Sequence, residues 1–136
     1  MMTYVGGVVS WQSRLQKFVA FSTTEAEYMV AVEVGKELIS MKKFLSELGM
    51  KQENFLLHCD NQSAIQLAKK AKYHSWTKHI QRRYHWLREK VDDGEFTLVK
   101  IHTDDNGSDM LTKNLPMDRL RVCRQRIGLV DSFPHE

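Results

Sequence analysis

The sequence predicts an α/β fold, a layered structure in which helices pack against a sheet. From Phe55 onward, short apolar segments alternate with segments of helical periodicity. The chain of 136 residues is long enough to enclose one hydrophobic core, and 42% hydrophobic with 27% charged residues is ordinary for a globular protein. We therefore expect one domain over residues 1–130 and a C-terminal tail over residues 131–136.

The N-terminal part, residues 4–22, is predicted to form β-structure. Apolar residues 8–11 and 18–21 flank a polar stretch, which is typical of a hairpin with a longer turn. These two apolar stretches are therefore expected to be the two strands of that hairpin.

A long helix is predicted to follow. Ser22 and Glu25 fit a capping box at its start, and Thr24 and Glu27 fit the same pattern. Gly49 suits its end. Apolar residues recur at steps of three and four and form one stripe, which comprises Ala26, Val30, Val34, Leu38, Met41, Leu45 and Leu48.

The next elements alternate between strand and helix. Phe55–Cys59 is an apolar run after polar residues and is predicted to be a buried strand in a parallel pairing. Asn61 is expected to cap a short helix that carries several apolar residues. A more basic helix is predicted over residues 77–91, with Ile80, Tyr84, Leu87 and Val91 on its inner face.

The C-terminal third is predicted to hold one more strand and one more helix. Phe96–His102 reads as the strand, after a turn that ends at Gly94. The helix is expected to run from residues 106–108 toward Ile127 and to be broken or bent at Pro116, because proline cannot continue a helix.

Glu27 is predicted to point toward the sheet. It shares one helical face with the apolar residues at i+4, i+7 and i+11, which are Ala31, Val34 and Leu38. Glu25 lies almost opposite and is expected to be solvated. An inward acid is costly unless it is paired or binds a cation. The alternative is a first-turn glutamate that the helix dipole favours.

Two further acids follow predicted strands. Asp60 comes directly after the strand Phe55–Cys59, where ligands of open α/β sheets collect, and Asn61 can take the capping role that Asp60 would otherwise fill. Asp109 is expected in the first turn of the last helix. The alternative for both residues is a helix-terminal acid without a functional role.

The motifs around these acids resemble the ribonuclease H domain of copia-type retrotransposon Pol polyproteins. The similarity extends from about Thr3 to Leu129. The stretches that carry it are residues 7–11, 22–28, 59–64, 77–80, 83–85 and 109–113.

This resemblance implies a ribonuclease H-like fold, a five-stranded mixed sheet flanked by helices. It also implies endonucleolytic hydrolysis of the RNA strand of an RNA–DNA hybrid by two metal ions, Mg²⁺ or alternatively Mn²⁺. The family's second, third and fourth catalytic and metal-binding acids fall on Glu27, Asp60 and Asp109. His102 lies near an auxiliary position of related enzymes, although a strand-end residue is the plainer interpretation.

The family's first catalytic Asp lies on a strand upstream of Tyr4, and we expect this chain to lack that strand and that acid. With one of four acids absent, the expected ribonuclease H activity is impaired. The alternatives are an inactive remnant that binds nucleic acid and a non-functional transposon fragment.

Positive charge is concentrated in residues 69–90, which hold eight Lys/Arg and one acid in a chain of net charge +3. Such a block suggests a polyanionic partner. With the resemblance, hybrid contacts are expected from Lys78, Arg82, Arg83, Trp86 and Asn61. The alternative is that Trp86 covers the edge of the core and the cations are solvated.

The remaining expectations concern partners and location. The predicted partners are an RNA–DNA hybrid and the reverse transcriptase part of a polyprotein, without a membrane. No secretory signal is recognisable, and two cysteines are too few for a disulfide framework. An intracellular location, cytoplasmic or nuclear, is therefore expected.

Overall fold

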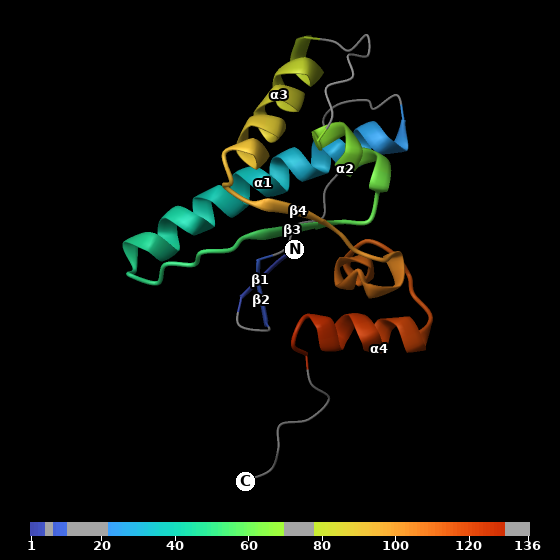
Figure 1. Ribbon diagram of the computed structural model, residues 1–136. Coiled ribbons are helices and arrows are strands. Elements are labelled where there is room, and N and C mark those ends of the chain that lie inside the picture. The colour runs from blue at the N-terminus through green and yellow to red at the C-terminus, as the bar shows by residue number, and fades with distance from the viewer. Residues whose placement is uncertain (5–6, 11–21, 70–77, 130–136) are drawn as a thin grey trace. The chain divides into compact units, whose positions relative to one another are not determined.

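The computed structural model describes residues 1–4, 7–10, 22–69 and 78–129 (Figure 1). These residues form a mixed α/β structure with four α-helices and two two-stranded sheets. The chain divides into two compact units. We call Phe18–Lys100 the helical unit, and Met1–Lys17 together with Ile101–Glu136 the terminal unit. The predicted single domain over residues 1–130 stays a prediction.

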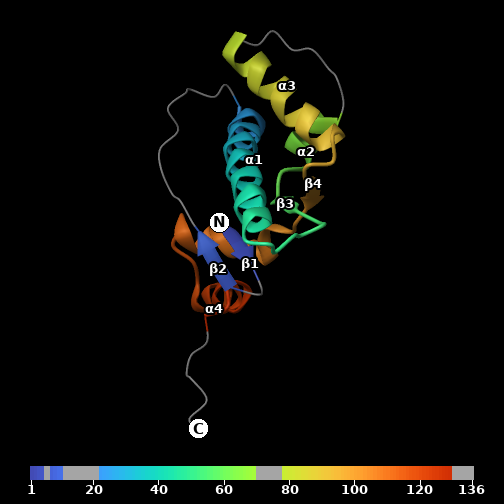
Figure 2. The ribbon, with the colours of Figure 1, turned by 90° about the vertical axis from the view of Figure 1, so that its left-hand side faces the viewer.

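The helical unit contains three helices and one sheet. Its helices are α1 (Thr23–Glu47), α2 (Gln62–Lys69) and α3 (Lys78–Asp92), and its strands are β3 (Leu56–Cys59) and β4 (Thr97–Lys100). The two strands pair in parallel, as predicted, with Leu56 opposite Thr97 and Cys59 opposite Lys100. Helices α1 and α2 contact the sheet, and α3 packs against these two helices (Figure 2). Alternate residues of β3 are accordingly buried, whereas those between them are exposed.

The ends of α1 follow from local sequence. The Ser22 side chain accepts a hydrogen bond of 3.1 Å from the Glu25 N–H, so the predicted cap is confirmed. At the other end Gly49 has φ +76°, a conformation that glycine adopts without strain. The Met50 N–H then donates to the Leu45 carbonyl at 2.8 Å, which closes the helix.

Two tyrosines join α1 to α3 within the core. The buried Tyr28 hydroxyl donates to the Tyr84 backbone carbonyl at 2.9 Å, and the two rings stack with centroids 5.4 Å apart. Gly35 lets α1 approach its neighbours closely. A Cβ atom there would lie 2.9 Å from Phe96 Cζ and 3.4 Å from Trp86 Cζ3.

The predicted pattern of burial along α1 was wrong in two respects. Glu25 was expected to be solvated but is only 6% exposed. It stands at the third helical position, where a capping-box glutamate folds back along the helix end instead of extending into water. Val30 and Leu48 belong to the predicted apolar stripe but are 46% and 54% exposed, because the buried face of α1 runs through Tyr28, Ala31, Val32 and Gly35.

The terminal unit begins with an antiparallel pair of strands. Strand β1 (Met2–Tyr4) pairs antiparallel with β2 (Gly7–Ser10). The expected pairing of residues 8–11 with residues 18–21 involves a stretch outside the described residues and stays a prediction. The position of β2 is fixed by a hydrogen bond of 3.2 Å from the Val8 N–H to the Ile127 carbonyl.

The C-terminal part of this unit contains three short helical segments rather than one helix. They are the 3₁₀ segments η1 (Thr103–Asp105) and η2 (Gly107–Leu111) and the α-helix α4 (Met117–Arg126). Asn106 caps η2 through its side chain, and Pro116 occupies the N-cap of α4. The predicted break at Pro116 is therefore confirmed, but an α-helix before it was wrong.

The described residues do not form the five-stranded sheet that the resemblance implies. They form the β1–β2 pair and the β3–β4 pair, each as a separate sheet. The ribonuclease H-like fold therefore stays a prediction, whereas the α/β class is confirmed.

Candidate metal site

The candidate site lies in the helical unit, where three possible metal ligands meet. One carboxylate oxygen each of Glu27 and Asp60 and the Sγ atom of Cys59 lie within 4.8 Å of one another. The two acids are partly buried and the cysteine is buried. The sequence predicted two of these three residues.

Glu27 reaches the site because of its phase on α1. Ala31, on the same helical face, is buried, and Val34 and Leu38 pack against the core. The predicted inward face of Glu27 is therefore confirmed. Its carboxylate meets Asp60 at the end of β3.

Asp60 reaches the site because the chain changes direction after β3. The next residue, Asn61, caps α2 by accepting a hydrogen bond of 3.1 Å from the Ala64 N–H, so the predicted cap is confirmed. Asp60 thus need not serve as the cap. Lys100, at the end of β4, donates from Nζ to the Asp60 backbone carbonyl, which ties the ends of the parallel strands together.

Negative charge accumulates at this point of the unit. Burial raises the pKa of the Cys59 thiol, and the neighbouring Glu27 and Asp60 carboxylates raise it further. The thiol lies 3.7 Å from the Asn61 carbonyl, to which it donates, and this bond and Lys100 act in the opposite direction on the pKa. Carboxylates this close to one another repel, and a divalent cation offsets that repulsion. The two carboxylates suit Mg²⁺, which prefers oxygen ligands.

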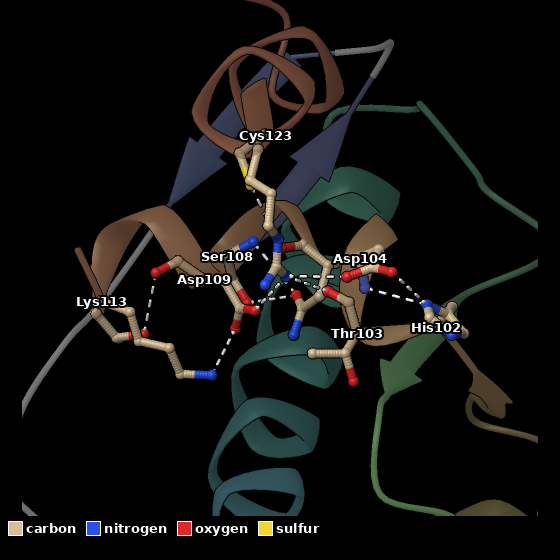
Figure 3. Close-up of polar contacts among 10 residues, drawn as sticks. His102, Thr103, Asp104, Ser108, Asp109, Lys113 and Cys123 are labelled. Carbon is tan, nitrogen blue, oxygen red and sulfur yellow. Dashed lines mark hydrogen bonds and ion pairs between the residues drawn. The ribbon is translucent and has the colours of Figure 1, made fainter. Parts of the chain in front are cut away.

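Asp109 lies in the terminal unit and is held there by cations. The residue is 4% exposed, and Lys113 Nζ approaches Oδ1 at 3.1 Å (Figure 3). Arg119 approaches Oδ2 at 3.4 Å and also lies 3.6 Å from Asp104 Oδ1. The buried charge of Asp109 is therefore compensated within its own unit. Its grouping with Glu27 and Asp60 stays a prediction.

His102 serves as a cap in the same unit. Its side chain is 73% exposed, and Nδ1 accepts a hydrogen bond of 3.2 Å from the Asp104 N–H at the start of η1 (Figure 3). This agrees with the plainer interpretation of a residue near a strand end. An auxiliary catalytic role for His102 stays a prediction.

The basic helix α3 carries both exposed cations and cations in ion pairs. Arg82 is exposed, whereas Arg83 lies 3.6 Å from Glu33 on α1. Trp86 packs against the core, and Lys36 Nζ lies 5.9 Å from its ring centroid. These contacts agree with the alternative that Trp86 covers the core edge. Nucleic-acid contacts by Arg82, Arg83, Trp86 and Asn61 stay a prediction, and the side chain of Lys78 is outside the described residues.

Sequence reasoning missed Cys59 as a possible ligand. Successive side chains of a strand point to opposite faces, so Cys59 and Asp60 would be expected to separate. The strand ends at Cys59, however, and Asp60 lies in the bend that follows. The position of Cys59 directly before an acid at a strand end was the available signal.

Curated relatives of the chain are known. It is 52% identical over 129 residues to the retrovirus-related Pol polyprotein from transposon TNT 1-94 of Nicotiana tabacum, a match over 95% of this chain and 10% of that protein. Its homologues are retrovirus-related Pol polyproteins of transposons. The corresponding proteins from transposons RE2 and RE1 of Arabidopsis thaliana are 35% and 34% identical, over 93% and 89% of this chain and 9% and 8% of their own lengths.

The chain thus spans about a tenth of the length of these relatives. No protein-family model matches it, and no solved structure matches it either. Within the described residues, no helix is both long enough and apolar enough to cross a membrane.

Proposed function

We propose that this chain is a ribonuclease H-type segment of a transposon Pol polyprotein and hydrolyses the RNA strand of an RNA–DNA hybrid. The observation that carries the proposal is the meeting of Glu27 and Asp60 at the carboxyl end of a parallel strand, with ligand atoms within 4.8 Å. Similarity to Pol polyproteins over nearly the whole chain supports it.

Glu27 and Asp60 are the proposed holders of a divalent cation, Mg²⁺ or Mn²⁺. When bound, such ions lower the pKa of water and stabilise the charge of a leaving oxygen. By holding the metal ions at the end of the sheet, the two carboxylates would fix the positive charge that binds the scissile phosphate. Their effect on the phosphate is therefore indirect. The buried faces of α1 and β3 hold both acids in place.

Asp109 is the proposed third acid. It can bind a metal ion only if its present ion pairs are broken. Lys113 and Arg119 would have to exchange their carboxylate for a metal ion. Because these ion pairs compete with a metal ion for Asp109, the proposal includes slow cleavage.

A second candidate function is hybrid binding without cleavage. The ion pairs at Asp109 favour it, because a carboxylate that is already neutralised by two cations is a poor ligand for a third. The cations of α3, of which Arg82 is exposed, would supply phosphate contacts.

The test is cleavage of a hybrid with a labelled RNA strand in Mg²⁺, together with calorimetric titration of Mn²⁺. Asp60→Asn and Glu27→Gln should each lower the cleavage rate by about a hundredfold, about 2.7 kcal/mol of barrier, and weaken Mn²⁺ binding. Glu37→Gln, an exposed acid on the same helix, is the matched control and should change neither quantity.

Three outcomes are informative. Cleavage that Asp60→Asn abolishes supports the enzyme. Binding of the hybrid by every variant without cleavage supports the second candidate. Cleavage or Mn²⁺ binding that is insensitive to both substitutions would show that the metal site has been assigned to the wrong residues.

A further inference from the structure

The sulfur atom of Cys59 gives the candidate site a different ligand chemistry from that of two carboxylates. Mg²⁺ is bound by oxygen atoms, whereas thiolate sulfur selects softer metals such as Zn²⁺ and Cd²⁺. Cys59 Sγ lies within 4.8 Å of both carboxylate oxygens, so one ion could contact all three atoms after a small adjustment.

The size of that adjustment follows from the geometry of zinc. In a tetrahedral site with bonds of 2.0–2.3 Å, neighbouring ligand atoms are about 3.3–3.8 Å apart. The three atoms therefore need to close by at most about 1.0–1.5 Å. Cys59 is fixed in β3 by its pairing with β4, and so the longer Glu27 side chain is the part that can adjust by rotation.

We propose that Glu27, Cys59 and Asp60 form a site for a thiophilic divalent metal ion, and that Zn²⁺ is the ion that binds there naturally. Three protein ligands leave a fourth position for water. Binding releases the thiol proton to solvent and forms the metal–sulfur bond, with no change of oxidation state. This site deepens the proposed function: it uses the same two carboxylates, so Zn²⁺ would exclude Mg²⁺ and inhibit hydrolysis.

The other cysteine provides a comparison within the same chain. Cys123 is also buried, and its Sγ donates to the Asn106 carbonyl at 3.7 Å. It belongs to no group of three possible metal ligands in the described part of the chain. Both thiols are thus buried and donate to a backbone carbonyl, but Cys59 alone of the two has a pair of carboxylates beside it.

The experiment is titration of the full chain with Cd²⁺, read by the ultraviolet charge-transfer absorption of the cadmium–thiolate bond. We expect one Cd²⁺ per chain and displacement of the band by Zn²⁺. Cys59→Ser should abolish the band, and the matched control Cys123→Ser should retain it. Glu27→Gln keeps the thiol but should weaken Cd²⁺ binding by at least about tenfold. Loss of a residue that only hydrogen-bonds to a metal ligand already costs about that much in metal affinity.

The result that overturns the proposal is a band that survives Cys59→Ser, disappears in Cys123→Ser, or fails to form in the unmodified chain. Unchanged Cd²⁺ affinity in Glu27→Gln would also overturn it. This variant does not alter β3, so it tests the proposal even if Cys59→Ser does not fold. The readout does not depend on hydrolysis. Absence of hybrid cleavage together with a Cys59-dependent band would therefore reject the proposed function and retain the metal site.

Discussion

The two units treat their inward carboxylates in opposite ways. In the terminal unit, Asp109 is matched by Lys113 and Arg119, so its buried charge is neutralised by the protein. In the helical unit, Glu27 and Asp60 lie together beside a third group that can also lose a proton. The first arrangement stabilises a fold, whereas the second brings like charges together, and a bound cation would offset their repulsion.

The largest expected effect tests the structural side of this comparison. Asp109→Ala should lower the free energy of unfolding by about 2 kcal/mol, because it leaves two cations without their shared acceptor. The value is below that for a fully buried pair, since Lys113 and Arg119 are partly exposed. Urea unfolding measures it. Asp93→Ala, at an exposed turn, is the control, and an equal loss in both variants would contradict the structural role of Asp109.

A smaller effect is expected at the contact that holds α1, and with it Glu27, against α3. Tyr28→Phe should cost about 1 kcal/mol at neutral pH, because the hydroxyl loses its bond to the Tyr84 carbonyl. Thermal unfolding measures this loss. The matched control is Tyr4→Phe in the terminal unit. It should cost less than Tyr28→Phe, because Tyr4 is only partly buried.

Tyr28 also predicts a dependence on pH. Burial, and then the neighbouring Tyr84, raise the pKa of Tyr28 well above its ordinary value of 10.0. The unfolded state therefore loses this proton first as the pH rises. Stability from Tyr28 is fully present below pH 10 and declines above it. Above that pH, Tyr28→Phe should lose stability less steeply than the unmodified chain, and parallel curves would contradict the assignment.

The smallest expected effect has the opposite sign. Without divalent metal and at low ionic strength, Glu27→Gln should raise the free energy of unfolding by about 0.5 kcal/mol, because one of two like charges is removed. Added Mn²⁺ should then stabilise the unmodified chain but not the variant. A loss of stability in Glu27→Gln without metal would place Glu27 with Asp109 among the structural acids.

The features predictable from sequence were those fixed within one or two turns of chain. Ser22 and Asn61 cap helices, Gly49 ends α1, and Pro116 interrupts the C-terminal segment, because each effect is local. The inward direction of Glu27 followed from helical periodicity. The parallel pairing of β3 with β4 followed from a continuous apolar run.

The features that the sequence did not predict depend on tertiary contacts. Strand β2 pairs with β1, a partner that the alternation of apolar residues does not predict. The exposure of Val30 depends on which neighbours α1 meets. Cys59 joins the candidate site because the chain bends after it, and periodicity does not extend across a bend.

Gly35 bears on the candidate site from a distance. It lies eight residues after Glu27 on α1, which is about 12 Å along the helix axis. A larger residue at this point would push against Phe96 and Trp86, and α1 would pivot there. At that distance, a tilt of about 5° displaces Glu27 by about 1 Å. This displacement is comparable to the adjustment that would bring the three ligand atoms onto one metal ion. The alignment of the acids is thus set in part by a residue without a side chain.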